Sequence, residues 1–155
     1  AVSSSNLSTD TGILATDLNS DGRYRDLLYV DGGVSSTQTT GVLVMQGKEV
    51  FKHAVEKLSS TAHAVLEKAG LSPSDVDWMV PHQANIRIIK ATAQKMKLPM
   101  TKVIVTVNNH GNTSAASIPL ALSVANIEKK FKKGDLILME AIGGGLAWGS
   151  ILLRL

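Results

Sequence analysis

The chain of 155 residues contains no cysteine. This absence excludes disulfides, thiolate metal sites and a cysteine nucleophile within the chain, and it is compatible with the cytosol. No stretch approaches the roughly 18 uninterrupted apolar residues of a membrane helix. No basic segment followed by an apolar one opens the chain. We therefore expect a cytoplasmic protein without a membrane segment.

Metal-binding and serine-hydrolase patterns are also lacking. His82 and His110 have asparagines rather than carboxylates as companions, which makes a poor set of metal ligands. No G-x-S-x-G elbow is present. The net charge of +3, from 16 basic and 13 acidic residues, falls short of a nucleic-acid signature but favours an acidic partner. We expect no metal ion and no nucleic acid.

The composition is that of an ordinary globular domain. Hydrophobic residues make up 44% of the chain and charged residues 19%, and this length is enough for one domain with a sizeable core. We treat residues 1–155 as a single domain. Because the chain opens at Ala1 without a methionine, we expect it to be a piece of a longer protein.

Hydrophobic patterning predicts alternating strands and helices. Apolar runs predict strands, and apolar residues on one face at 100° per residue predict helices. We expect strands at 12–18, 27–30, 76–80, 102–107, 135–142 and 148–155, a loop at 31–41, and helices at 47–69, 84–97 and 113–131. The alternation indicates an α/β fold, with a mixed, mostly parallel sheet covered by helices on both faces. No helix separates the last two strands, so the last strand should be antiparallel.

Unusual residues follow three of the predicted strands, at the strand ends where ligands bind in α/β sheets. His82 comes directly after a strand and a proline, and Asn112 precedes a helix opening rich in small residues. Both side chains are neutral donors at pH 7, a pair suited to stabilising an oxyanion or enolate. Asn112 is alternatively a helix cap or turn residue, and His110 is a weaker candidate than His82. The pair has no nucleophile of its own.

Three glycines, Gly143–Gly145, follow the third of these strands. They do not form a dinucleotide-binding loop, because a strand rather than a helix comes after them. They either bring the backbone close to a reacting group and present an N–H, or make a plain tight turn.

Three segments together show a family resemblance. They are DWMVPHQANIRII (77–89), VNNHGNTSAAS (107–117) and EAIGGGLAWGS (140–150). They closely resemble the C-terminal half of β-ketoacyl-[acyl-carrier-protein] synthase III, a family of thiolase-like condensing enzymes. MQGKEVFKHAV (45–55) resembles the start of that family's long helix. The resemblance extends over residues 12–155.

The resemblance implies the C-terminal half of a thiolase-like fold, in a homodimeric acyltransferase of fatty acid biosynthesis. Such enzymes condense an acyl-CoA, usually acetyl-CoA, with malonyl-acyl carrier protein and release CO2. No cofactor is implied beyond CoA thioesters and phosphopantetheine-linked substrates. His82 and Asn112 match the residues that stabilise the enolate, and Gly144 matches the backbone donor of the oxyanion hole. The nucleophilic cysteine belongs to an N-terminal half that this sequence lacks, so we expect the chain alone to be inactive.

The resemblance also implies contacts with the acyl carrier protein. The matching residues are Gln83, Ala84, Asn85, Ile86 and Arg87. On the predicted helix 84–97, a basic stripe lies roughly opposite a buried face, which suits an acidic carrier, although a merely solvated basic face is the alternative. The stripe consists of Arg87, Lys90 and Lys97, and the buried face of Ile86, Ile89, Ala93 and Met96.

Two positions depart from the family pattern. Ile142 and Leu146 flank the glycines where members often have phenylalanine, which bears on the preferred acyl starter. A second function also stays open. In that alternative the chain is a non-catalytic half-domain that binds an acidic carrier protein or another subunit.

Overall fold

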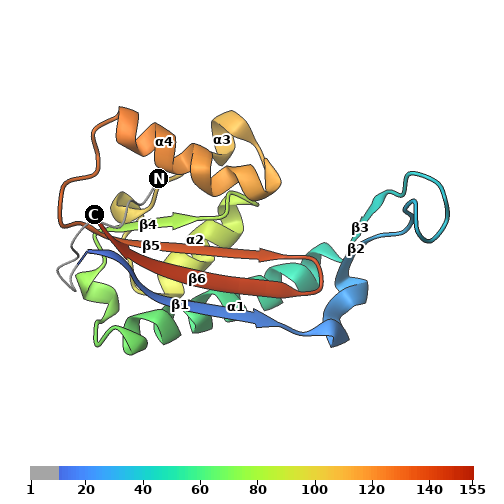
Figure 1. Ribbon diagram of the computed structural model, residues 1–155, viewed down its shortest axis with the longest axis horizontal. Helices are drawn as coiled ribbons and strands as arrows, with labels where there is room; N and C mark the ends of the chain where they lie inside the picture. The colour runs from blue at the N-terminus through green and yellow to red at the C-terminus, as the bar shows by residue number, and fades with distance from the viewer. Residues whose placement is uncertain (1–10) are drawn as a thin grey trace.

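The computed structural model describes residues 11–155, so the first ten residues of the expected domain lie outside the described residues. Its central sheet has the order β1 (Gly12–Ser20), β6 (Ala147–Arg154), β5 (Leu136–Gly143), β4 (Trp78–Pro81) (Figure 1). β6 pairs antiparallel with both neighbours, and β4 pairs parallel with β5. Three strands therefore run in one direction and β6 opposes them. This confirms the mixed sheet and the antiparallel last strand, but only one neighbouring pair is parallel.

Helices cover both faces of the sheet, as the patterning predicted. The long helix α1 (Gly47–Lys68) and α2 (Ile86–Lys95) lie on one face, and α4 (Ser117–Ile127) lies on the other (Figure 1). Successive side chains of β5 alternate between two apolar clusters, since strand residues point to opposite faces. Leu136 and Leu138 join the cluster under α1 and α2, whereas Ile137 joins the cluster under α4.

The helix α1 forms where its apolar spacing predicts. The helix buries a stripe that packs against β1, β5 and β6. The chain leaves the helix at Gly70, whose φ of 67° lies in the left-handed region that glycine adopts without strain. The buried apolar residues of the stripe are Val50, Ala54, Leu58, Ala62, Val65 and Leu66.

The strand expected at 102–107 does not form, and this prediction is wrong. The segment makes one isolated parallel bridge, Met79 with Val103, and the Ile104 N–H donates to the Met79 carbonyl at 2.9 Å. Beyond that point the backbone is bound by the side chain of Gln83 instead of a strand ladder. The chain then turns into a single-turn helix, α3 (Val107–His110).

The helix expected at 113–131 is shorter and in two parts. A 3₁₀ turn at Ser114–Ala116 precedes α4, which ends at Ile127. Pro119 is the third residue of α4, where its missing N–H costs no helical hydrogen bond, so it does not interrupt the helix.

A small hairpin projects from one end of the sheet (Figure 1). After the 3₁₀ helix at Gly22–Leu27, β2 (Leu28–Val30) pairs antiparallel with β3 (Leu43–Met45), and the predicted loop at 31–41 joins them. Two further 3₁₀ turns lie at Pro73–Asp75 and Met100–Lys102. Large apolar side chains on the hairpin are exposed, namely Tyr29, Val30, Val34, Val42, Leu43 and Met45.

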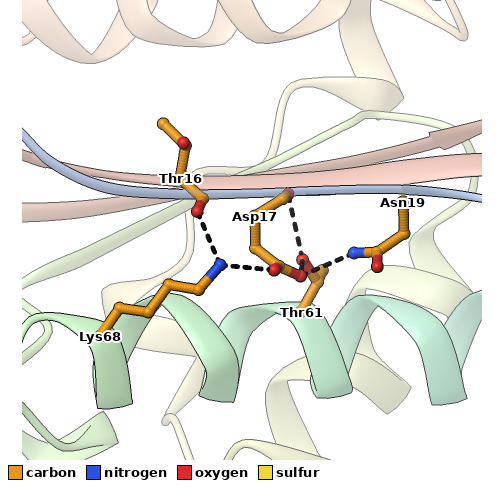
Figure 2. Close-up of polar contacts among 5 residues, drawn as sticks. All are labelled: Thr16, Asp17, Asn19, Thr61 and Lys68. Atoms are coloured by element: carbon orange, nitrogen blue, oxygen red, sulfur yellow. Dashed lines mark hydrogen bonds and ion pairs between the residues drawn. The ribbon is translucent and has the colours of Figure 1, made fainter.

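Polar contacts tie the edge strand β1 to α1 (Figure 2). The Lys68 ammonium lies 2.7 Å from Asp17 Oδ1 and donates to the Thr16 carbonyl at 3.0 Å. The Thr61 hydroxyl donates to Asp17 Oδ2 at 2.7 Å, and the Asn19 amide donates to the same oxygen at 2.6 Å. The Lys68 hydrogen bond, followed by that of Thr61, lowers the pKa of Asp17 below its ordinary value.

Within residues 11–155, no helix is both long enough and apolar enough to span a membrane.

Candidate functional site

One pocket of about 1100 Å³ gathers residues from all three strand-end motifs. It lies where β4 and β5 end, between the start of α1, the start of α2 and the segment before α4. His82, Asn112 and Gly144 all line it. The topology explains this convergence, because β4 and β5 are parallel neighbours whose carboxyl ends meet at the same edge of the sheet.

His82 is held at the end of β4 from two sides. Its backbone N–H donates to the Glu140 carbonyl at 2.7 Å, which extends the pairing of β4 with β5. Its ring Nδ1 lies 2.6 Å from the Ser117 hydroxyl at the start of α4. Burial lowers the pKa of His82 below its ordinary value, so the imidazole is neutral at pH 7.

Asn112 presents its amide nitrogen as a donor. Its Oδ1 accepts the Ser114 N–H at 2.9 Å, so the side chain forms an Asx turn before α4. Within residues 11–155, Nδ2 has no hydrogen-bond partner. The cap interpretation and the donor interpretation of Asn112 are therefore compatible, because they use different atoms of the same amide.

Gly144 lies in the turn that joins β5 to β6 and is exposed on the pocket wall. A Cβ at this position would approach the Leu28 carbonyl oxygen to 3.0 Å. A glycine thus lets the turn pack closely against β2. In the described part of the chain the Gly144 N–H donates no backbone hydrogen bond outside the sheet pairing.

The environment of Gln83 differs from the one that the sequence predicted. Its side chain is fully buried, and its amide is engaged with backbone on both sides. Nε2 donates to the carbonyls of Pro81 and Ile104, while Oε1 accepts the N–H groups of Thr106 and Val107. The expectation that Gln83 contacts a carrier protein is wrong for its side chain, because no polar atom of that side chain is left at the surface. It connects the His82 segment to the segment that leads to Asn112.

The remaining residues that we expect to contact the carrier protein lie at or near the pocket rim. Ala84 is half-buried, and Asn85 caps α2 by accepting the Arg87 N–H at 2.8 Å. Ile86 is 36% exposed, so the prediction that it shares the buried face is wrong. Arg87 is exposed, and its guanidinium lies 5.4 Å from the centre of the Phe51 ring.

The buried and basic faces of α2 otherwise follow the sequence pattern. Ile89, Ala93 and Met96 are buried in the cluster under α1 and α2. Lys90 and Lys97 are exposed. Of the three predicted cations, Arg87 and Lys90 therefore lie on α2, whereas Lys97 lies two residues beyond its last residue, Lys95.

The other histidines stay outside the pocket. His110 is exposed on α3, and His63 is exposed on α1. His53 packs against Tyr24 with ring centres 4.4 Å apart. Among residues 11–155, no group of three or more histidine, aspartate or glutamate side chains is placed to hold a metal ion.

Comparison with known proteins identifies the family. The family described as "3-Oxoacyl-[acyl-carrier-protein (ACP)] synthase III C terminal" matches residues 66–155, a range that contains His82, Asn112 and Gly144. The chain belongs to this family.

Curated relatives of this synthase III family match almost the whole chain. The β-ketoacyl-[acyl-carrier-protein] synthase III of Paracoccus denitrificans is 73% identical over 147 residues, which is 95% of this chain and 46% of the relative. That of Cereibacter sphaeroides is 70% identical over 151 residues, 97% of this chain and 46% of the relative. The chain thus spans about half the length of the curated relatives it matches.

Solved structures of synthase III enzymes show the same fold. The 3-oxoacyl-[acyl-carrier-protein] synthase III of Aquifex aeolicus superposes with a TM-score of 0.87 at 47% identity, covering 94% of this chain and 45% of that one. The enzyme of Pseudomonas aeruginosa gives 0.85 at 39% identity, covering 92% and 44%. The chain therefore has the fold of the C-terminal half of a thiolase-like synthase III enzyme.

Sequence reasoning missed Ser117, which contacts a residue of the candidate site. Its hydroxyl contacts the ring of His82, although 35 positions separate the two residues. The only signal in the sequence was that Ser117 ends the run of small residues that opens the predicted helix. Such a run predicts close packing of the helix but no specific contact.

Proposed function

We propose that the chain is the C-terminal half of a β-ketoacyl-acyl carrier protein synthase III, which condenses an acyl-CoA with malonyl-acyl carrier protein to initiate fatty acid synthesis. The observation that carries the proposal is the shared pocket of His82 and Asn112, two neutral donors in a chain that contains no cysteine nucleophile. The names of the curated relatives and their greater length support it.

In this reaction the chain performs the decarboxylation. The bond between the carboxylate carbon and the α-carbon of the malonyl thioester breaks, and CO2 leaves. The electron pair of that bond stays with the thioester, which becomes an enolate. His82 and Asn112 donate hydrogen bonds to the enolate oxygen, whose negative charge develops as CO2 departs. Neutral donors suit this step, because they stabilise the oxygen without protonating the carbon nucleophile.

Condensation then needs the other half of the enzyme. The enolate carbon attacks the acyl thioester held on a cysteine of the N-terminal half, and that cysteine leaves as a thiolate. Gly144 supplies its backbone N–H to the oxyanion formed at the acyl carbonyl. The chain contains no cysteine, so it performs neither acyl transfer nor condensation alone.

The substrates bring their own prosthetic groups. CoA and the carrier's phosphopantetheine arm are parts of the thioester substrates, and no resident cofactor or metal is required. Arg87 is exposed at the pocket rim, Lys90 is exposed further along α2, and Lys97 is exposed just beyond the end of the helix. In the proposed complex these cations face an acidic carrier protein. Ala84 and Ile86 add apolar contact beside Arg87. We assign no carrier contact to the Gln83 side chain.

Exposed apolar surface supports the need for a partner half. Leu43 and Met45 on the hairpin are 67% and 56% exposed and also line the pocket, and Leu18 on the edge strand β1 is 81% exposed. Such side chains at the rim of one pocket mark a surface that another protein covers. The N-terminal half and a second copy in a cytoplasmic homodimer are the occupants we propose.

A fused enzyme tests the function. The N-terminal half of the Paracoccus denitrificans relative, which brings the cysteine, is joined to this chain, and β-ketoacyl product is measured with acetyl-CoA and malonyl-acyl carrier protein. We expect condensation by the fused enzyme and none by the chain alone. A folded, dimeric fused enzyme that acetylates its cysteine but never decarboxylates malonyl-acyl carrier protein would contradict the proposal. Carrier binding by the chain alone, together with that failure, would indicate a non-catalytic half-domain.

A further inference from the structure

A buried hydroxyl group joins the end of β4 to the start of α4. Ser117 Oγ lies 2.6 Å from His82 Nδ1 and accepts the backbone N–H of Gln83 at 3.2 Å. Ser117 is the first residue of α4 and is only 2% exposed. The catalytic roles proposed above belong to His82, Asn112 and Gly144, and none of them involves Ser117.

Counting hydrogens assigns the direction of the contact. A serine hydroxyl has one hydrogen and two lone pairs. The Gln83 N–H occupies one lone pair, because a backbone N–H can only donate. Among residues 11–155, no other acceptor lies within hydrogen-bonding distance of Ser117 Oγ. The hydroxyl hydrogen therefore goes to His82 Nδ1, which accepts it.

This direction decides which nitrogen of His82 can donate. When Nδ1 accepts, the neutral imidazole carries its single hydrogen on Nε2. The opposite arrangement, with Nδ1–H donating to Ser117, would leave Nε2 with a lone pair. A lone pair cannot stabilise the negatively charged oxygen of an enolate.

The surroundings of the ring keep it neutral. Burial is the cause of the lowered pKa of His82, and no charged side chain contributes to it. Glu140, whose backbone carbonyl accepts the His82 N–H, has a buried side-chain carboxyl. Burial raises the pKa of that carboxyl to about 8, so it is uncharged at pH 7.

We propose that Ser117 is a positioning residue, which holds His82 as the Nε2–H tautomer so that this N–H donates to the malonyl thioester oxygen. The role rests on the function proposed above. Ser117 itself touches no substrate and acts only through the ring of His82.

Nitrogen NMR of the fused enzyme tests the assignment directly. With ¹⁵N-labelled histidine, the signals of His82 are identified by their loss in His82→Gln. We expect a protonated Nε2 and an unprotonated Nδ1 in the unsubstituted enzyme. A protonated Nδ1 in that spectrum overturns the proposal, whatever any variant does.

Variants of Ser117 test the consequence. Ser117→Ala should slow malonyl decarboxylation roughly 10- to 100-fold, by analogy with the loss seen when the partner that orients a metal-bound histidine is removed. Acetylation of the cysteine from acetyl-CoA should not change, since that step does not use His82. Ser117→Thr keeps the hydroxyl and should restore most of the rate. Ser59→Ala is the matched control, because Ser59 is equally buried but bonds only to carbonyls of its own helix.

The measured pKa of His82 separates positioning from simple packing. A hydroxyl that donates to Nδ1 stabilises only the neutral ring, so Ser117→Ala should raise the pKa. A fall in the pKa, or unchanged decarboxylation in a folded Ser117→Ala enzyme, overturns the proposal. If Ser117→Ala does not fold, the NMR spectrum of the unsubstituted enzyme and the rate of Ser117→Thr decide. Absent decarboxylation in the unsubstituted enzyme counts against the proposed function, while the Nδ1 signal still decides the Ser117 contact.

Discussion

Gln83 Oε1 accepts the backbone N–H of Thr106 at 2.8 Å, inside the protein and 23 positions along the chain. In a β-sheet, this N–H would donate to a backbone carbonyl of the neighbouring strand. Here the side-chain carbonyl of Gln83 takes the place of that acceptor. It also fixes the segment of His82 against the segment that leads to Asn112. The geometry of the candidate site therefore depends on a residue that does not line the pocket.

Replacement of this amide should destabilise the fold and the site together. In Gln83→Leu the N–H groups of Thr106 and Val107 lose their buried acceptor, at a cost of about 1–3 kcal/mol for each unsatisfied group. We expect a lower midpoint of thermal unfolding for the fused enzyme and slower decarboxylation. Gln94→Leu on the exposed face of α2 is the control, and equal losses in both variants would contradict the role of Gln83.

Removal of the imidazole should act on decarboxylation alone. His82→Ala removes one oxyanion donor, which lowers the rate of malonyl decarboxylation by about 10²–10³-fold. Because His110 is exposed and outside the pocket, His110→Ala should retain the full rate. Release of CO2 from malonyl-acyl carrier protein measures both variants, and an unimpaired His82→Ala enzyme would show that the donor lies elsewhere.

The pH dependence of decarboxylation should follow the neutral form of His82. Its pKa lies below the ordinary 6.5 because the ring is buried, so the neutral ring persists as the pH falls through that value. Protonation at lower pH also fills Nδ1, which removes the acceptor for the Ser117 hydroxyl. We expect an acidic limb of the rate profile with a midpoint below 6.5, and a midpoint above it would contradict the burial argument.

A side chain at Gly144 should disturb acyl transfer. The added Cβ of Gly144→Ala meets the Leu28 carbonyl oxygen at 3.0 Å, so the turn must shift by a few tenths of an ångström. The N–H that we assign to the oxyanion hole moves with it, and small misplacements of a catalytic donor are costly. We expect slower acetylation of the cysteine while the malonyl thioester still binds. Gly22→Ala, which meets no atom within 4 Å, serves as the control.

Glu140 should make stability fall as the pH rises. Glu140 lies on β5, and its carboxyl is fully buried with no hydrogen-bond partner among residues 11–155. This burial raises its pKa from 4.5 to about 8. Between these values the folded state binds more protons than the unfolded state, so the free energy of unfolding declines with pH and levels off above about 8.

The variant Glu140→Gln isolates this effect. An amide of the same shape does not ionise, so its stability relative to the unsubstituted enzyme should increase from pH 4.5 to pH 8. Thermal unfolding across that range measures the difference. Glu56→Gln, at an exposed site on α1, should leave the pH dependence intact. A difference between Glu140→Gln and the unsubstituted enzyme that stays constant with pH would mean that the carboxyl ionises normally.

The local sequence pattern was sufficient to predict those helices and strands whose packing depends only on which side chains are buried. The apolar stripe predicted α1 to within one residue at its end, and the lack of a helix after β5 predicted the antiparallel pairing of β6. The positions of His82, Asn112 and Gly144 after their segments also follow from the sequence. Periodicity reports which side chains face a core, and these features depend on little else.

Tertiary structure alone decided where buried polar groups find their partners. Residues 102–107 have the composition of a strand, yet their backbone is bound by the Gln83 side chain instead of a full ladder. Ser117 meets His82 because α4 packs its first turn against the end of β4. Ile86 remains exposed because it is the first residue of α2, beside the pocket rim. Each outcome depends on a contact between distant segments, and such a contact leaves no periodic signal in the sequence.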